Sequence, residues 1–216
     1  MNSSGTHRAS RLEDVLDVVA IGASLGGLDA VRALLRNIPE NFMAPIVIAQ
    51  HRMSDPDGLL VDLLGGQSRL PVLEPDDKEP IQCGHVYVAP PDYHLIVEHG
   101  YFALSTDAAV CHARPSIDVL FESVALSYGA LAIGVVLTGS SRDGADGARA
   151  VKAAGGRVLV QDPRTAWSPV APKAVLATTA ADAVLDIDGL AEKLVALCAR
   201  RDSEEDPRAA LRRAAF

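Results

Sequence analysis

Cysteine is scarce in this sequence: only Cys83, Cys111 and Cys198 occur, and they lie far apart. No two of them have the C-x-x-C spacing of a zinc knuckle, and three cysteines cannot all pair with one another. The sequence therefore predicts neither a disulfide framework nor a metal site, and nothing in it predicts a cofactor. Reduced thiols are typical of cytoplasmic proteins, so a cytoplasmic location is expected.

Long apolar runs, aromatic residues and excess positive charge are also missing. No run approaches the length of a membrane span, and residues 1–11 lack the apolar segment of a signal peptide, which argues against membrane insertion. Aromatic residues make up 4% of the chain, and 20 Lys and Arg stand against 28 Asp and Glu, which gives a net charge of −8. Since no basic stripe is present, nucleic acid is not an expected partner.

The residues that are present favour an aliphatic α/β protein, since 49% of them are hydrophobic. Apolar, β-branched runs alternate with segments of helical periodicity. Strands are expected near residues 17–23, 45–50, 71–74, 85–89, 130–137, 157–161 and 183–187, and helices near 26–37, 57–64, 116–128, 145–154, 171–177 and 189–200. This alternation predicts a doubly wound, mostly parallel sheet with helices on both faces, which is a three-layer αβα fold.

One pair of strands departs from that alternation. Residues 93–97 and 101–104 predict a small antiparallel hairpin at one edge of the sheet. The pattern as a whole fits one domain over residues 14–200. A flexible lead-in is expected over residues 1–13 and a charged tail over residues 201–216.

The first strand ends in a stretch of small residues, Gly22-Ala-Ser-Leu-Gly-Gly27, which puts Ser24 on a tight turn before a helix. Unpaired N–H groups and the dipole at the start of a helix favour negative charge, so Ser24 suits a nucleophile whose product is an oxyanion. Two alternatives stay open. One is a phosphate-binding turn, although neither G-x-G-x-x-G nor Gly-Lys-Ser/Thr is present; the other is that small residues simply let the helix pack close to the strand.

Three polar residues, Ser24, His51 and Asp143, each lie at or just beyond the end of a buried strand. If these strands are neighbours, the side chains meet at one edge of the sheet as nucleophile, base and orienting carboxylate. Taken singly, His51 could instead cap a helix and Asp143 could be an N-cap. Asp146 falls in a first helical turn and is expected to face solvent. The chain order Ser, His, Asp, with the serine after the first strand, disfavours an α/β-hydrolase fold.

Histidines near the hairpin carry weaker signals. His85, His94 and His99 lie on or beside it without metal-ligand spacing and are expected to face solvent. His112 lies close to Arg114, and the two either line a substrate groove or pack over the start of the next helix.

Taken together, these features resemble the catalytic domain of the bacterial chemotaxis protein-glutamate methylesterase, CheB. The resemblance covers most of the chain, from about Val18 to about Ile187. It rests on the following stretches: Ile21-Gly-Ala-Ser-Leu-Gly-Gly27, Gln50-His51, Gly84-His-Val-Tyr-Val-Ala-Pro90, Arg114-Pro-Ser-Ile-Asp-Val-Leu-Phe121, Gly134-Val-Val-Leu-Thr-Gly139 and Asp143-Gly144. Members of this family hydrolyse γ-glutamyl methyl esters on chemoreceptor helices and can deamidate receptor glutamine.

The resemblance implies that Ser24, His51 and Asp143 form the triad of a serine carboxylesterase. The oxyanion would be held by backbone N–H groups near the serine or in the loop before the aspartate. The candidates for this role are Leu25, Gly26, Ser140 and Ser141.

The implied partners are methylated chemoreceptor helices and other chemosensory signalling proteins. Arg52 and Arg142 each adjoin a proposed catalytic residue, and Arg114 is a third candidate for the rim of the substrate groove. We expect these cations to attract acidic receptor helices.

The chain departs from the family pattern at three places near the expected site. The family usually has Thr-Gly-Met-Gly-x-Asp-Gly where this chain has Thr138-Gly-Ser-Ser-Arg-Asp-Gly144, and Gly-Met-Pro where it has Val170-Ala171-Pro172. Leu25 stands where threonine is common. These changes keep a second hypothesis open, a catalytically weak or inactive CheB-like binding module in a signalling complex. About twenty residues precede Ser24, too few for the family's receiver domain, which is therefore expected to be absent.

Overall fold

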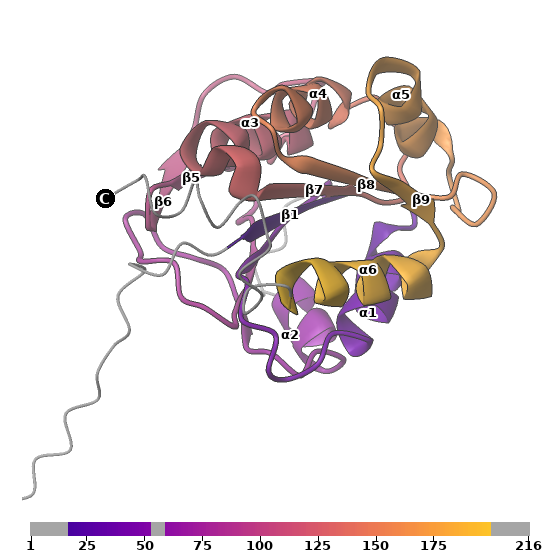
Figure 1. Cartoon of the computed structure of the whole chain (residues 1–216). Helices are drawn as coiled ribbons and strands as arrows, with labels where there is room; N and C mark the ends of the chain where they lie inside the picture. The colour runs from indigo at the N-terminus through magenta and orange to yellow at the C-terminus, as the bar shows by residue number, and fades with distance from the viewer. Residues whose placement is uncertain (1–16, 53–58, 200–216) are drawn as a thin grey trace, which may run out of the picture.

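The computed structural model describes residues 17–52 and 59–199, and its centre is a seven-stranded sheet. The strands are β1 (Val18–Ala23), β2 (Ile46–Gln50), β3 (Val72–Leu73), β4 (Val86–Val88), β7 (Ala132–Val136), β8 (Arg157–Gln161) and β9 (Ala183–Leu185). They lie in the order β3-β4-β2-β1-β7-β8-β9, and every neighbouring pair is parallel. Figure 1 labels β1, β7, β8 and β9 of this sheet.

Helices cover both faces of the sheet, so the predicted three-layer αβα fold is confirmed (Figure 1). One face carries α1 (Gly27–Arg36), α2 (Leu59–Gly65) and α6 (Ile187–Ala199). The other carries α3 (Ile117–Tyr128), α4 (Ala145–Ala153) and α5 (Val170–Thr178). The predicted lead-in and tail lie outside the described residues, as do the first two residues of the helix predicted near 57–64.

The sequence pattern explains these elements. All six residues of β1 are buried, as expected for a parallel strand covered by helices on both faces. In α1 the buried positions Ala30, Val31, Leu34 and Leu35 recur at helical spacing and face the sheet. Before β7, Ala130 and Leu131 form a short 3-10 turn (Gly129–Leu131) rather than the start of the strand.

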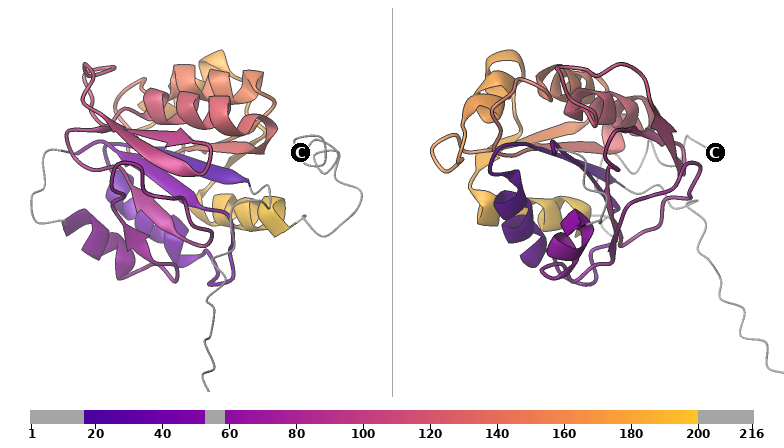
Figure 2. Two further views of the ribbon diagram at one scale, coloured as in Figure 1. Left: turned by 90° about the vertical axis from the view of Figure 1, so that its left-hand side faces the viewer. Right: turned by 180° about the vertical axis from the view of Figure 1, so that it is seen from behind.

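The predicted hairpin is present as a separate two-stranded sheet, β5 (His94–Glu98) and β6 (Tyr101–Ser105). Figure 2 shows it on the side of the molecule where α3 and β4 lie. Its Phe102 ring packs 4.5 Å from the ring of Tyr87 in β4. The Val97 N–H donates a hydrogen bond to Ser123 of α3. The hairpin is thus fixed to α3 and β4, and the loop that follows it reaches the carboxyl ends of the strands.

Candidate active site

The strands that precede Ser24, His51 and Asp143 are neighbours in the sheet, as β2-β1-β7. Backbone pairing continues beyond the strand ends. The Ser24 N–H donates to the Thr138 carbonyl at 3.0 Å, and the His51 N–H donates to the Ala23 carbonyl at 3.0 Å. The three residues therefore lie at one edge of the sheet, where ligands bind in doubly wound folds.

The turn that carries Ser24 depends on two glycines. Gly26 has a φ of 77°, a left-handed conformation that favours glycine. A Cβ at Gly27 would lie 2.2 Å from Oε1 of Gln50, so only glycine lets the Gln50 side chain approach. The Gly27 N–H donates to the Ser24 carbonyl at 2.8 Å and closes the turn.

Gln50 joins the serine turn to the histidine. Its Nε2 donates to the carbonyl of Ser24 at 2.9 Å and to that of His51 at 3.1 Å, and the side chain is buried. In the sequence, Gln50 stands out only as the neighbour of His51. The sequence feature that could have indicated this role is the amide side chain at the end of an otherwise apolar strand.

Asp143 is a buried carboxylate at the start of helix α3. It accepts hydrogen bonds from the N–H groups of Ile117 and Asp118 at 2.8 and 2.9 Å, and from the Ser116 hydroxyl at 2.9 Å. Its fourth partner is the His51 ring, with Nε2 at 2.7 Å from Oδ2. These donors fix both carboxylate oxygens. Asp143 therefore does cap a helix, as the sequence suggested, but the helix it caps is α3 and not α4, which follows it in the chain.

The charge state of Asp143 follows from these contacts. Burial opposes ionisation, but the hydrogen bonds from His51 and from the N–H groups of Asp118 and Ile117 outweigh burial and hold the pKa of Asp143 below its ordinary value of 3.8. Asp143 is therefore a carboxylate at neutral pH and accepts a hydrogen bond from the Nε2–H of His51. This assigns the tautomer in which Nδ1 carries the lone pair.

Among the described residues, neither Ser24 Oγ nor His51 Nδ1 makes a hydrogen bond. A long nucleophile–base distance is common before substrate binds. Both atoms are therefore available, one to attack a carbonyl carbon and the other to take a proton.

Backbone N–H groups near Ser24 are also available. Within residues 17–52 and 59–199, no hydrogen bond engages the N–H groups of the four oxyanion candidates Leu25, Gly26, Ser140 and Ser141. Leu25 and Gly26 precede the first turn of α1, where free N–H groups favour negative charge. The Ser141 hydroxyl accepts from the Asp143 N–H at 3.0 Å, so the serine found in place of the usual family residue supports the loop that carries the acid.

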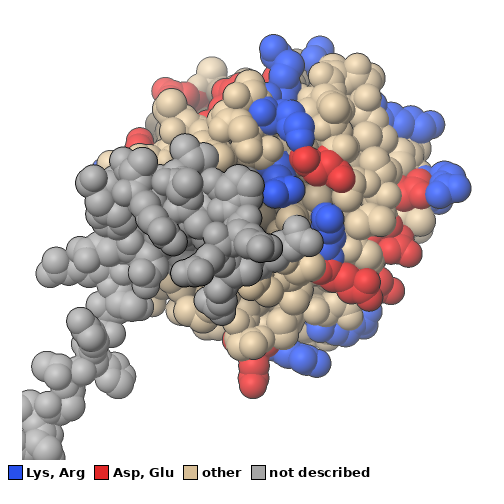
Figure 3. All heavy atoms as spheres, viewed as in Figure 1, with Lys and Arg blue, Asp and Glu red and all other residues tan. Residues whose placement is uncertain are grey.

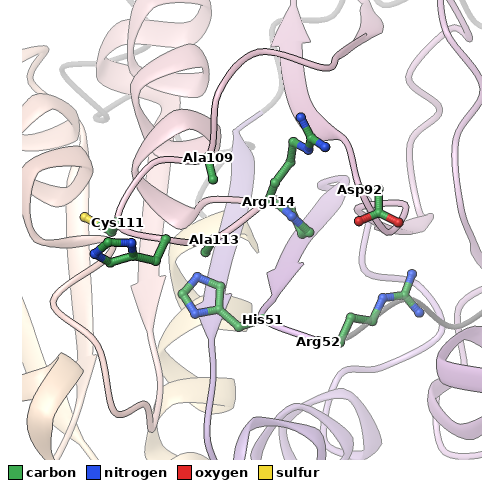
Figure 4. Close-up of a pocket in the computed structure, with 9 residues that line it drawn as sticks. His51, Arg52, Asp92, Ala109, Cys111, Ala113 and Arg114 are labelled. Atoms are coloured by element: carbon green, nitrogen blue, oxygen red, sulfur yellow. The ribbon is translucent and has the colours of Figure 1, made fainter.

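A groove of about 650 Å³ opens beside His51 (Figure 4). Its other lining residues are Arg52, Asp92, Ala109, Cys111, His112, Ala113, Arg114 and Pro115. Figure 4 shows the His51 ring pointing toward the loop that carries Cys111 and Ala113. His112 therefore belongs to the groove, the first of the two placements considered for it.

Two of the three predicted groove arginines line this groove. Arg52 forms an ion pair with Glu74, so its charge is locally balanced. Arg114 donates from Nη1 to the carbonyls of Thr106 and Asp107, at 2.8 and 3.0 Å. Within the described residues Arg114 has no acidic partner, so its positive charge acts on the groove.

The third arginine, Arg142, lies outside the groove lining. It is exposed at the start of α4 and pairs with Asp146 at 3.4 Å. Asp146 also pairs with Arg149 at 3.0 Å, and its side chain is partly exposed. The prediction that Asp146 faces solvent, unlike the buried Asp143, is confirmed.

A second hollow, of about 550 Å³, opens beside the turn that carries Ser24. Leu25 and Gly26 line it together with Trp167, whose side chain is 81% exposed. The Trp167 Cβ lies so close to Gly26 that a Cβ there would come within 2.6 Å. The turn that carries Ser24 thus lines a hollow distinct from the groove beside His51.

Cys111, Asp118 and Asp143 place a thiol and two carboxyl groups within 4.8 Å of one another. Such a set could offer three ligands to a metal ion. However, backbone N–H groups already bind both carboxylates, which accounts for the position of these two side chains as helix caps. We therefore assign no metal to them.

The expectation that His94 faces solvent is wrong. Its side chain is 2% exposed. Nε2 lies 3.1 Å from the Ala108 carbonyl, and Nδ1 accepts the Ser116 N–H at 3.2 Å. His94 thus ties the hairpin to the start of α3. His99 is exposed, as expected, and His85 is half-buried.

A parallel, doubly wound sheet that brings serine, histidine and aspartate to one edge is typical of a hydrolytic enzyme of the α/β class. Comparison with known proteins gives the family. The model described as CheB methylesterase matches residues 19–194. The chain belongs to the CheB methylesterase family.

Individual relatives agree in sequence and in fold. A Leptospira interrogans relative is 40% identical, over 84% of this chain and 94% of its own length. An Anaeromyxobacter dehalogenans relative named protein-glutamate methylesterase/protein-glutamine glutaminase 2 is 41% identical, but this chain spans only 54% of its length. The crystal structure of the Thermotoga maritima CheB methylesterase catalytic domain superposes with a TM-score of 0.81 at 36% identity, covering 84% of this chain and 98% of that one.

Proposed function

We propose that this chain hydrolyses γ-glutamyl methyl esters on chemoreceptors, releasing methanol, with Ser24, His51 and Asp143 as its catalytic triad. The observation that carries the proposal is the 2.7 Å contact between His51 Nε2 and a fully hydrogen-bonded Asp143, at the sheet edge where Ser24 lies. Membership of the CheB methylesterase family supports the ester chemistry.

In the first half of the reaction, Ser24 Oγ attacks the ester carbonyl carbon while Nδ1 of His51 takes the hydroxyl proton. Asp143 holds the ring by its Nε2–H and stabilises the imidazolium that forms. The oxyanion is held by the free N–H groups of Leu25 and Gly26 or of the Ser140–Ser141 loop. The tetrahedral intermediate then breaks its C–O bond to the methoxy group, which leaves as methanol with the proton from His51.

In the second half, His51 takes a proton from water as the water oxygen attacks the acyl–Ser24 ester. Collapse of this second intermediate returns the proton to Ser24 Oγ and frees the glutamate. The same steps on a glutamine side chain would release ammonia. The A. dehalogenans relative is named for both activities, which supports glutamine deamidation as a second reaction.

The proposed partner is a cytoplasmic receptor helix bearing the ester, with other chemosensory signalling proteins as further partners. Among the described residues, no helix has the length and apolar character needed to cross a membrane. On the face shown in Figure 3, Lys and Arg are interspersed with Asp and Glu, which does not favour nucleic acid as a partner of that face.

Salt is expected to slow the reaction on an acidic receptor. Because the positive charge of Arg114 lies on the groove without an acidic partner in the described part of the chain, it should steer a negatively charged substrate. We expect kcat/KM for a methylated receptor fragment to fall about threefold between low and high ionic strength. Hydrolysis of a small neutral ester serves as the control, and its rate should not change. Equal salt dependence for both substrates would contradict the role of Arg114.

Removal of the Gln50 amide is expected to misalign the site. Gln50→Ala leaves the carbonyls of Ser24 and His51 without their shared donor, so kcat should fall about tenfold with little change in KM. Gln67→Ala, on the turn after α2, is the matched control and should keep the full rate. Methanol release from a methylated receptor fragment measures both. Equal rates for the two variants would show that Gln50 does not position the reacting groups.

A further inference from the structure

A second acid, Asp118, lies behind the proposed triad. It is in the first turn of α3, and its side chain is buried, with 5% exposed. Its Oδ1 accepts the N–H groups of Gly144 at 2.9 Å and Gly147 at 2.7 Å, at the start of α4. Asp143, one residue before Gly144, in turn accepts the N–H of Asp118 at 2.9 Å. Asp118 of α3 thus caps the start of α4, and Asp143, just before α4, caps the start of α3.

This exchange fixes the position of Asp143 from two directions. Its own carboxylate is bound to the start of α3, and the residue that follows it, Gly144, is bound to Asp118. Gly147 allows the close approach of the helices, because a Cβ there would lie 3.0 Å from the Asp118 Cα and 2.6 Å from the Phe121 Cβ. Movement of Asp118 would therefore displace the carboxylate that orients His51.

Asp118 also adds charge. Burial and the nearby charge of Asp143 raise the pKa of Asp118 to about 6, although the N–H groups of Gly147 and Gly144 oppose this shift. Both oxygens of Asp143 are already occupied by donors and the pKa of Asp143 is lowered, so of the two acids Asp118 is the one that takes up a proton first as pH falls.

The other titratable or charged groups around Asp118 are few. The Cys111 thiol lies 3.9 Å from Oδ2 on the loop before α3, and burial raises the pKa of this thiol. His94 of β5 contacts the N–H of Ser116 at the same helix end. Arg142 and Asp146 pair with each other at the exposed start of α4, and His51 lies beyond Asp143. The strands β1, β2 and β7, which lie against α3, contain no charged residue.

We propose that Asp118 is a positioning residue of the active site, which fixes Asp143 and whose ionisation strengthens the negative field that stabilises the His51 imidazolium. This inference rests on the proposed function. It implies that the rate of hydrolysis increases as pH rises and Asp118 loses its proton. A second negative charge then lies behind His51 and stabilises its protonated ring in the transition state.

Ionisation of Asp118 has the opposite effect on folding. Its pKa is raised from 3.8 to about 6 in the folded chain, so the stabilisation it gives is full below pH 3.8 and is lost as pH rises through about 6. At neutral pH the buried charge therefore destabilises the fold. A structural cap alone would not need this charge, because a neutral amide also accepts both N–H groups.

Asp118→Asn separates capping from charge. The amide oxygen keeps the bonds to Gly144 and Gly147, and the NH2 group imitates the protonated acid. We expect kcat/KM relative to wild type to be nearly equal at pH 5 and about fivefold lower at pH 8. The melting temperature of Asp118→Asn should match that of wild type at pH 5 and exceed it by about 5 °C at pH 8. Asp118→Ala, which loses both cap and charge, should be slower at every pH.

The control is Asp146→Asn, which removes one exposed acid from the adjoining helix and should follow wild type at every pH. Methanol release from a methylated receptor fragment and thermal unfolding of the full chain give the two readouts. A rate ratio for Asp118→Asn that is flat from pH 5 to pH 8, or a melting temperature that falls at pH 8, would overturn the inference. Failure of the proposed function appears differently, as hydrolysis that persists in Ser24→Ala.

Discussion

Replacing Ser24 with alanine is expected to lower the rate of methyl ester hydrolysis by about 10⁴-fold or more. The hydroxyl is the only group at the sheet edge proposed to bond to the substrate, so its loss removes the acyl-enzyme route. Any remaining rate would come from binding and from the N–H groups near Leu25. The measurement is methanol released from a receptor fragment methylated at glutamate.

The fold should survive this substitution. Within the described residues the Ser24 hydroxyl makes no hydrogen bond, and the backbone bonds of Ser24 do not depend on its side chain. An unchanged melting temperature would show that the loss is chemical. Ser68→Ala, on the loop after α2, is the matched control and should retain full activity. Hydrolysis by purified Ser24→Ala at more than a few per cent of the wild-type rate would refute the assignment of the nucleophile.

Asp143→Asn is expected to lower the rate by about 10³- to 10⁴-fold, less than the loss at Ser24, because the acid orients the base without bonding to substrate. An NH2 group in place of Oδ2 leaves both the His51 ring and the Ile117 N–H without their acceptor, whereas one in place of Oδ1 leaves the Asp118 N–H without its acceptor. The first outcome favours the wrong tautomer of His51. Asp146→Asn, which alters only an exposed ion-pair network, should stay within about twofold of wild type.

The same substitution also tests the capping role. Ile117 and Asp118 donate to different oxygens of Asp143, so an asparagine NH2 group leaves one buried N–H without an acceptor. We expect the free energy of unfolding to drop by about 1–3 kcal/mol. Thermal unfolding before the assay identifies conditions in which the variant is folded. Equal activity losses at Asp143 and Asp146 would mean that the wrong carboxylate had been chosen.

The fold and the three candidate catalytic residues were predictable because both depend on local pattern. Apolar β-branched runs followed by glycine turns and helical periodicity define βα units, and such units have few ways to assemble. Ser24 and His51 follow their strands directly, so their meeting required only that β1 and β2 be neighbours. Asp143 was distinguished from Asp146 by its place before Gly144.

The supporting residues were not predictable in this way, because their partners are far away in the sequence. Asp118 reads as an ordinary acid of a first helical turn, and its partners lie 26 and 29 residues later. The sequence feature that could have indicated its burial is that Asp118 lies three residues before Phe121, on the same face of the helix. His94 was misplaced because alternation in a two-stranded hairpin does not show which face α3 and the following loop will cover.

The most direct test of the central claim is to trap the acyl-enzyme. An activated p-nitrophenyl ester is mixed with the full chain, the reaction is quenched in acid, and the modified peptide is identified by mass spectrometry. The triad predicts a burst of nitrophenol with one acyl group per chain on Ser24, no burst in Ser24→Ala, and slow acylation in Asp143→Asn. A chain that releases no burst, or that is acylated elsewhere while Ser24 stays unmodified, would contradict the account and favour a binding module that retains the CheB fold without turnover.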